Sequence, residues 1–548
     1  MPRIPLWIFL LFAALHFSAA RLDIMDIDAA QYAEISREMM TSDNWLHIYD
    51  RGADYLDKPP FLFWVSALSM KVFGVNNFGY RFPSILFALW AIYATYRLAR
   101  LLYDENTGRV AALILACCQG MFLMTNDVRT DTILMGLTIT AVWMIKEWEM
   151  KRRMHYMVLG SASIAFGMMT KGPIALLVPV FCFASDWFLK RDWKKFFQLA
   201  YLLALFVMLI LLVPMSIGLY HQFDLHPEKL VNGQTGVSGL RFFFWTQSFG
   251  RITGENVWDN NAPFSFLFEN MLWSFLPWIL LFVFAFLINT IELIKQKFRL
   301  QSHQEWLSTG GFLLAYLALG SSKYQLPHYI FIVFPLAAIM VAKLLKEFYE
   351  GKYQWLFRFM KGAHTVIGAL LLIGALFTFI YVFKGATWIY IFWTAGVIIW
   401  LLVLFKKGAK SKMIYATVVA MIIANVILTH HFYHSLFRYQ VGSKFGRLIR
   451  KENIPVRNIV IHNIKDPLTC LSFYAERMII RSDSFPVLSK GDFLITSRDG
   501  IDDVQKMGLD VRIKDHGRFF KVSELTPEFL NPKTREQTLN DYYLVQIQ

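Results

Sequence analysis

Residues 199–219 read LAYLLALFVMLILLVPMSIGL and contain no charged side chain. An apolar run of about 20 residues is long enough to cross the hydrocarbon core of a bilayer as a helix. Similar runs recur along the chain, in which hydrophobic residues make up 56% and charged residues only 17% of the composition. A soluble protein carries about a quarter charged residues. The sequence therefore predicts an α-helical, polytopic membrane protein.

Hydropathy and turn residues predict about thirteen transmembrane helices in this chain. We expect the first span to remain as an anchor, although Arg3, an apolar run and Ser18-Ala19-Ala20 also fit a cleaved signal peptide. The expected spans centre on residues 8–20, 83–102, 110–124, 132–146, 156–170, 173–189, 199–219, 268–287, 306–319, 330–345, 363–383, 389–405 and 415–429.

Lysine and arginine are concentrated in one set of alternate loops, for example at residues 151–153 and 190–195. Positive loops stay in the cytoplasm, so the N-terminus is expected there and two long loops, 21–80 and 220–269, are expected outside. An odd number of spans then exports the C-terminal segment. The net charge of +15 is explained by these loops and by lipid headgroups, so we expect membrane lipids and no nucleic acid as partners.

Two domains are expected: a transmembrane catalytic domain at 1–430 and a small exported α/β domain at 431–548. Alternating apolar residues predict strands at 458–462, 478–481 and 492–496, and helices between them at 445–451, 468–476 and 502–507. The four cysteines provide neither a disulfide framework nor a cysteine-based zinc site.

The first long loop is expected to contain two helices. Asp28 precedes Tyr32, Ile35 and Met39 at helical spacing, which predicts an amphipathic helix over 29–40 on the membrane surface. Pro59 and Pro60 then begin a second helix over 61–72, which is too interrupted to span the membrane by itself. Such helices place the polar residues of the loop at headgroup depth.

Asp28 and Lys58 are the first two residues that we expect to carry chemistry. A carboxylate at a helix start can accept a proton from an attacking hydroxyl or amine. A lysine held beside two prolines can stabilise the charge that grows on a leaving phosphate. The alternatives are an ordinary helix cap for Asp28 and a lysine that reaches toward lipid headgroups for Lys58.

Further ionisable residues flank the apolar spans. Asp57 is expected to orient Lys58 or to join Asp26 as an oxygen ligand of a divalent metal, and whether a metal binds stays open. Asp131 is expected to be a second catalytic residue beside Asp28 and to contact a sugar or hold a cation, with simple capping as the alternative. The other candidates for substrate contact are Arg129, Lys171, Arg251, Lys323 and Tyr329, and His328 is expected to be interfacial.

Together these residues resemble motifs of the GT-C glycosyltransferases, in the superfamily of protein O-mannosyltransferases and lipid A aminoarabinose transferases. No single motif is specific, but their combination is. The resemblance covers roughly residues 1–430. It rests on 28–39 (DAAQYAEISREM), Asp57-Lys58-Pro59-Pro60, Arg129-Thr130-Asp131, Lys171-Gly172, Phe244-Trp245 with Arg251, and Lys323 through Pro327-His328-Tyr329.

The resemblance implies an EC 2.4 enzyme of the bacterial inner membrane that uses a polyprenyl (undecaprenyl) phosphate-linked sugar on the periplasmic side. It implies Asp28 as the catalytic carboxylate, Lys58 as the contact to the lipid phosphate, and lipid A, a glycan or a protein of the cell envelope as acceptor. The chain departs from the family where Ala29 follows Asp28, and where Gln247 and Ser248 replace the glutamate and histidine of the aminoarabinose transferases.

Three other functions remain alternatives to an inverting sugar transfer. A polysaccharide polymerase or ligase would use a lipid-linked glycan and a larger exterior loop. A transporter would show paired repeats and ionisable residues at mid-membrane. A scaffold or receptor would bind a partner through its exported tail. The clustering of ionic residues at one face favours the transferase.

Overall fold

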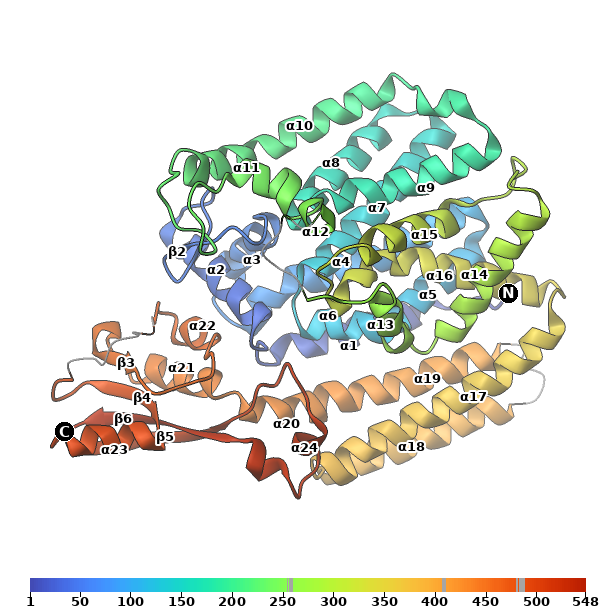
Figure 1. Ribbon diagram of the computed structural model, residues 1–548. Coiled ribbons are helices and arrows are strands. Elements are labelled where there is room, and N and C mark those ends of the chain that lie inside the picture. Colours follow the sequence, from blue (N-terminus) through green and yellow to red (C-terminus); the bar gives the residue numbers. More distant parts are fainter. Residues whose placement is uncertain (254, 256–259, 407–410, 480, 482–487) are drawn as a thin grey trace.

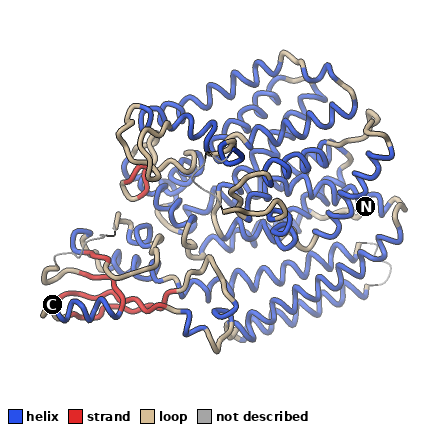
Figure 2. The backbone as a smooth tube through the Cα atoms, in the orientation of Figure 1, coloured by secondary structure: helices blue, strands red, loops and turns tan. Residues whose placement is uncertain are grey.

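The computed structural model describes the chain except residues 254, 256–259, 407–410, 480 and 482–487, and except the side chains of residues 251 and 252. Most of the chain is helical, and Figure 2 shows its strands confined to one end of the molecule. A bundle of long helices forms the bulk of the protein, and a small α/β unit, coloured orange to red, lies beside one end of that bundle (Figure 1).

The bundle contains helices of very different length. Side-chain caps begin two of them: Asn76 accepts a hydrogen bond from the backbone of Gly79 in α4, and Asp104 does so from Thr107 in α5. The helices are α1 (Leu6–Ser18), α4 (Asn77–Leu102), α5 (Glu105–Cys117), α6 (Gln119–Asn126), α7 (Thr130–Lys151), α8 (Met154–Lys171), α9 (Ile174–Lys190), α10 (Ala200–Leu219), α13 (Phe266–Ser274), α14 (Ile279–Lys295), α15 (Leu307–Gly320), α16 (Phe334–Tyr349), α17 (Gln354–Phe377), α18 (Thr387–Phe405) and α19 (Lys412–Ile427).

Burial separates central from peripheral helices. In the segment Pro327–Tyr349, which contains α16, 89% of the apolar window is buried, whereas in α18 only 17% is. An apolar helix that exposes most of its surface needs lipid around it. The helix α18 is therefore at the periphery of the bundle, and α16 is in its core.

Six helices among the described residues are long and apolar enough to cross a membrane, or seven if the bent pair α5 and α6 forms one span. They are Asn77–Leu102, Trp193–Asp224, Pro327–Tyr349, Gln354–Val382, Thr387–Phe405 and Lys412–Tyr439. Other expected spans form shorter helices, such as the 14-residue α15. The figure of about thirteen spans stays a prediction.

The first long loop contains α2 (Asp28–Ser42), β1 (Tyr49–Asp50), β2 (Ala53–Asp54) and α3 (Phe61–Phe73). Both helices expected there are thus confirmed. The polar side chains of α2 are covered rather than exposed: Glu34 and Arg37 are buried and form an ion pair of 2.6 Å. The cause is packing, since α3 contacts α2 and the C-terminal unit packs against it too.

The second long loop consists of short helical turns. These are the π-helical turns η3 (Tyr220–Asp224) and η4 (Phe242–Thr246), with α11 (Gly239–Arg241) before η4 and α12 (Gly250–Thr253) after it. Figure 1 shows α11 beside β2 and α2, at the end of the bundle opposite the N-terminus. Both long loops and the C-terminal sheet therefore lie at the same end of the molecule.

The C-terminal unit contains a four-stranded sheet in the order β3-β4-β6-β5. The strands β3 and β4 are parallel, and the other neighbours are antiparallel. The elements of the unit are α20 (His434–Leu436), α21 (Val441–Lys451), β3 (Ile459–Ile461), α22 (Leu471–Ala475), β4 (Phe493–Ser497), α23 (Arg498–Lys506), β5 (Val511–Phe519), α24 (Pro527–Leu530) and β6 (Asn540–Ile547).

Two of the three expected strands are present as β3 and β4. The strand expected at 478–481 is not formed at residues 478, 479 and 481, and residue 480 lies outside the described residues. The strands β5 and β6 were not expected, because β5 carries the charged residues Arg512, Lys514 and Asp515 and lacks the apolar pattern of a buried strand. The domain boundary at residue 430 stays a prediction.

Candidate active site

Two adjoining cavities lie beneath the long loops. One is mostly apolar and is lined by the three charged residues Lys58, Asp131 and Lys171, among others. The other, of about 980 Å³, is polar and is lined by Asp28, Asp57 and Lys58. Lys58 and Tyr329 line both cavities, so they stand at the boundary between an apolar and a polar space.

Asp28 begins α2 and faces the polar cavity. It forms an ion pair with Arg129, which also binds Asp127 at 2.8 Å. The Asp28 side chain is 38% exposed, whereas that of Arg129 is 17% exposed. Burial raises the pKa of Asp127. Arg129 thus holds the Asp28 carboxylate in place while leaving it open to a ligand in the cavity.

Lys58 precedes α3 and forms an ion pair of 2.6 Å with Asp57. Asp57 therefore orients Lys58, which was one of its two expected roles. The side-chain amide of Gln247 donates a hydrogen bond to the backbone carbonyl of Asp57. Gln247 comes from the second long loop, so that loop fixes the turn that carries the lysine.

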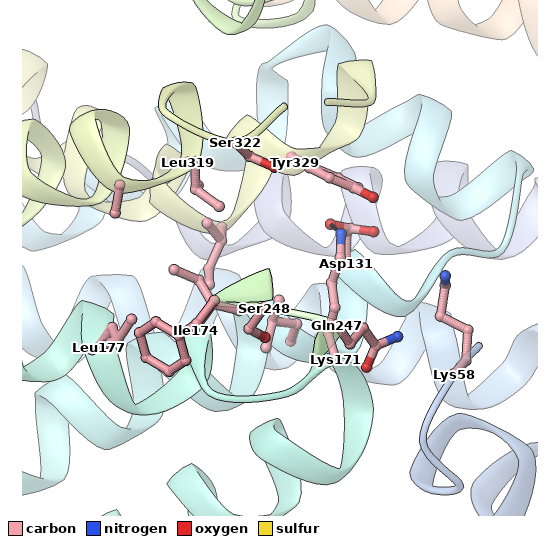
Figure 3. A pocket seen from close by; sticks show the side chains of 14 residues that line it. Lys58, Asp131, Lys171, Ile174, Leu177, Gln247, Ser248, Leu319, Ser322 and Tyr329 are labelled. Carbon is pink, nitrogen blue, oxygen red and sulfur yellow. Dashed lines mark hydrogen bonds and ion pairs between the residues drawn. The ribbon is translucent and has the colours of Figure 1, made fainter. Parts of the chain in front are cut away.

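Asp131 and Lys171 form a buried ion pair of 2.5 Å between α7 and α8. Their side chains are 1% and 14% exposed. The ammonium of Lys171 lies 3.8 Å from the ring centroid of Tyr329, and Nε2 of His328 lies 3.6 Å from Oδ2 of Asp131. Figure 3 shows Asp131 and Lys171 next to Tyr329, with Lys58 to one side. Asp131 thus holds a cation, which was one of the roles that the sequence predicted for it.

The turn after Lys171 requires glycine. Gly172 has a φ of 100°, a conformation that side chains rarely adopt, and an added Cβ would lie 3.2 Å from Oγ of Ser248. This glycine lets α8 end immediately before Pro173 begins the next helix. The sharp turn holds Lys171 at the wall of the apolar cavity.

Three expected site residues are not among the described residues that line the cavities. Arg129 lines neither cavity as the described residues form them, but it binds Asp28, which lines the polar one. The side chain of Arg251 lies outside the described residues. Lys323 is exposed and lines neither cavity as the described residues form them. The sequence singled out Ser248 only as a departure from the family pattern, whereas Gln247 was also one of the polar residues of the second long loop that were expected to face a cavity. Both residues line the apolar cavity. Their position after the aromatic run at 242–245 was the one available signal.

A metal site is not supported by the side chains present. Among the described residues, no group of three or more histidine, cysteine, aspartate or glutamate side chains could hold a metal ion. Asp57 binds Lys58, whereas Asp26 accepts a hydrogen bond of 2.8 Å from the backbone of Cys470. The expected pairing of Asp26 with Asp57 at a metal is therefore not formed, and no chemical step is assigned to a metal.

Asp26 instead connects the first long loop to the C-terminal unit. Its backbone N–H donates to Gln440, and its carboxylate accepts from Cys470. Burial raises the pKa of the Asp26 carboxyl to about 7, although the hydrogen bonds from Cys470 and the charge of Arg51 oppose that rise. The contact lies two residues before Asp28.

We expect the folded state to lose stability as pH rises from about 6 to 8, because the buried carboxyl of Asp26 then becomes charged. A carboxyl whose pKa is raised on folding favours the folded state at low pH, and this contribution is lost as pH rises through 7. A shift from 3.8 to about 7 corresponds to at most about 4 kcal/mol over the whole range from pH 3.8 to 7, of which only about 1.4 kcal/mol is lost between pH 6 and pH 8. Asp26→Asn should remove this pH dependence, measured as the difference in thermal midpoint between pH 6 and pH 8.

Asp43→Asn is the matched control, since this carboxyl lies in the same loop with a side chain that is 76% exposed. It should leave the difference between the two midpoints unchanged. Burial also raises the pKa of Glu38 to about 7. Glu38 titrates in the wild type and in Asp26→Asn alike, so its contribution cancels when the two proteins are compared. An equal pH dependence in Asp26→Asn and wild type would contradict the assignment.

The chain is similar to known membrane transferases. The family described as dolichyl-phosphate-mannose-protein mannosyltransferase matches residues 57–217. A protein of Edwardsiella ictaluri (strain 93-146), named undecaprenyl phosphate-alpha-4-amino-4-deoxy-L-arabinose arabinosyl transferase, is 27% identical over 325 residues, which are 58% of this chain and 54% of that protein. A Pseudomonas fluorescens (strain Pf0-1) protein of the same name, numbered 2, is 30% identical over 322 residues, 57% of this chain and 54% of its own. The chain thus spans about half the length of the curated relatives it matches.

The structural similarity is more extensive. The crystal structure of ArnT from Cupriavidus metallidurans bound to undecaprenyl phosphate superposes with a TM-score of 0.74 at 16% identity, over 98% of this chain and 97% of that one. These matches confirm the resemblance expected from the motifs, and the fold is that of a GT-C membrane protein. With its apolar helices, the chain is a multi-pass membrane protein.

Proposed function

We propose, on the premise of this GT-C fold, that the protein is a glycosyltransferase that moves a sugar from a polyprenyl phosphate to an acceptor at the outer face of the membrane. The observation that carries the proposal is that Asp28 and Lys58 line one cavity, and that Lys58 also lines the adjoining apolar cavity. The proposed base and the proposed phosphate contact thus line one space, in which the sugar is proposed to bind. The donor is proposed to be an undecaprenyl phosphate sugar, because the curated relatives are named for one.

The proposed reaction is an inverting displacement at the anomeric carbon. Asp28 accepts the proton of the acceptor hydroxyl or amine while that group bonds to the sugar. The bond between the anomeric carbon and the phosphate oxygen breaks, and the electron pair leaves with the phosphate. Lys58 stabilises the charge on the departing oxygen. Lys171, held by Asp131, supplies a second positive charge on the wall of the apolar cavity.

The proposed topology places this site in the periplasm. The long loops and the C-terminal sheet lie at one end of the bundle and the N-terminus lies at the other (Figure 1). The positive loops favour a cytoplasmic N-terminus in a bacterial inner membrane. Residues 1–430 are then the transmembrane catalytic domain and 431–548 a periplasmic α/β domain. The acceptor is proposed to be lipid A, another glycan or a protein.

The function is tested in a strain that lacks the protein. Mass spectrometry of its lipids and envelope glycans should find one missing sugar and an accumulated prenyl-linked precursor. Wild-type protein should restore the sugar, whereas Lys58→Met should restore it ten- to a hundredfold less efficiently, because a hydrogen bond to a charged group contributes about 1.5–3 kcal/mol. The variant protein should be present in the membrane at the wild-type level.

Lys71→Met is the matched control for this experiment. Lys71 lies on α3, the helix that follows Lys58 in the chain. Its side chain is 61% exposed, and its ion pair with Asp43 measures 4.0 Å. This variant should complement fully. An unchanged lipid and glycan profile in the deletion strain would overturn the proposed function.

A further inference from the structure

A third cavity lies between the end of the helical bundle and the C-terminal unit. It is formed where α20, α21 and β5 meet the segment between α17 and α18 and the residues that follow α1 (Figure 1). It is the most voluminous of the three, at about 2430 Å³. It shares no lining residue with the two cavities of the candidate active site.

The lining of this cavity is strongly basic. Asp23 is its one carboxylate among the described residues, and it is paired with Arg447. The cationic side chains of the lining are Arg21, Lys384, Arg438, Lys444, Arg447, Arg518 and Arg535. We therefore refer to it as the basic cavity.

Several of these cations already have partners within the fold. Lys444 binds Asp515 at 2.7 Å, and Arg518 binds Glu536 at 2.7 Å. Arg535 donates to backbone carbonyls, including that of Val382 at 2.6 Å, and its guanidinium lies 4.5 Å from the ring centroid of Phe383. These side chains form the wall of the basic cavity. To bind a ligand, each of them would have to give up a native contact.

Arg21, Lys384 and Arg438 differ from the others. All three are exposed, and none has a carboxylate within ion-pair distance in the part of the chain that the structure describes. Three cations that face one space without counter-charge repel each other and attract an anion. Arginine pairs with phosphate oxygens through two parallel hydrogen bonds, so phosphate is the anion whose geometry fits.

The position of the basic cavity indicates where that phosphate comes from. Lys384 lies between two candidate spans, Gln354–Val382 and Thr387–Phe405, and Arg438 lies at the end of a third, Lys412–Tyr439. The cavity therefore opens at the end of three apolar helices, which is the depth of lipid headgroups. Its lining also includes exposed apolar and aromatic side chains, namely Ile380, Tyr381 and Tyr390. A ligand with a phosphate and a hydrocarbon chain matches both surfaces.

The geometry points to a binding site for a lipid that carries a phosphate group: we propose that the basic cavity holds the phosphorylated headgroup of an anionic lipid of the outer leaflet. The site adjoins the candidate active site through the chain itself. Asp23 lines the basic cavity, and five residues later Asp28 lines the polar cavity, a separation of at most roughly 18 Å for an extended chain. This inference does not rest on the proposed transferase activity, since it concerns binding alone.

The test uses the purified full-length protein in neutral detergent, titrated with dioctanoyl phosphatidic acid and followed by native mass spectrometry. Lys384→Gln combined with Arg438→Gln should weaken the binding of one lipid molecule by about tenfold or more, because each cation near an anionic lipid contributes about 1 kcal/mol. Dioctanoyl phosphatidylcholine, whose headgroup has no net charge, should bind more weakly than phosphatidic acid to the wild type.

The matched control is Arg498→Gln combined with Lys506→Gln. These residues lie on α23 of the same unit, with side chains that are 64% and 77% exposed, and neither lines the basic cavity. This control should bind the lipid as the wild type does. Equal affinity of wild type and Lys384→Gln/Arg438→Gln for phosphatidic acid would overturn the proposal. Inorganic phosphate that displaced the lipid at equal concentration would overturn the assignment to a lipid.

Discussion

Asp28→Asn is expected to reduce sugar transfer by about 10²- to 10⁴-fold, the range that a positioned general base contributes. The amide keeps the size of the side chain and still accepts a hydrogen bond from Arg129, but it does not take a proton from the acceptor. Arg129 retains its ion pair with Asp127. The fold and the binding of undecaprenyl phosphate should therefore be preserved, and the loss should appear in kcat.

The measurement is an in vitro transfer assay with purified protein, together with its thermal midpoint. Asp54→Asn is the matched control, because Asp54 lines the same polar cavity but binds Lys229 at 3.1 Å. We expect this control to keep a rate far above that of Asp28→Asn. Transfer by Asp28→Asn at the wild-type rate would remove Asp28 from the role of base.

Lys171→Met is expected to destabilise the protein by about 3–5 kcal/mol, because it leaves the carboxylate of Asp131 buried without its cation. The side chain of Asp131 is 1% exposed, and Nε2 of His328 lies 3.6 Å from its Oδ2 atom. Replacing both partners, as Asp131→Leu with Lys171→Met, should recover most of the stability, since two apolar side chains fill the site without a buried charge. Thermal unfolding in detergent measures both changes.

The double variant also separates stability from function. If Lys171 contacts the departing phosphate, the stable double variant should still be impaired in transfer. The pair Lys190 and Asp186 is a matched control, with a distance of 2.8 Å and side chains that are 13% and 3% exposed. Lys190→Met should be destabilised similarly without a specific loss of transfer at the same temperature. Full activity of the Asp131→Leu/Lys171→Met variant would assign the ion pair to stability alone.

Local features of the sequence predicted much of the candidate site. The helix expected over 29–40 is α2, and the helix expected after the two prolines is α3. Asp28 and Lys58 were singled out from the sequence as site candidates, and the structure places both in the lining of one cavity, while their chemical roles stay predictions. These predictions succeeded because helix periodicity, proline and the composition of a loop act over a few residues.

Contacts between distant residues were not predicted. Asp28 binds Arg129, which is 101 residues away, and Asp131 binds Lys171, which is 40 residues away. Gln247 reaches the backbone of Asp57 across 190 residues. In the sequence, each of these residues was a separate candidate with no assigned partner. Which cation or amide a carboxylate meets is decided by how the helices pack, and the local sequence does not contain that information. The same limit explains why β5 and β6 were missed, since their pairing compensates for a weak local pattern.

The sequence by itself determined that this chain is a bundle of apolar helices with charged loops at one end, because the free energy of placing apolar and charged groups depends on composition along the chain. Only the tertiary structure decided which charges are neutralised and which face a cavity. The reason is that a buried charge is tolerated only with a partner, and partners are brought together by packing rather than by position in the sequence. The ion pairs of Asp131 and Arg129, and the uncompensated cations of the basic cavity, are therefore properties of the fold.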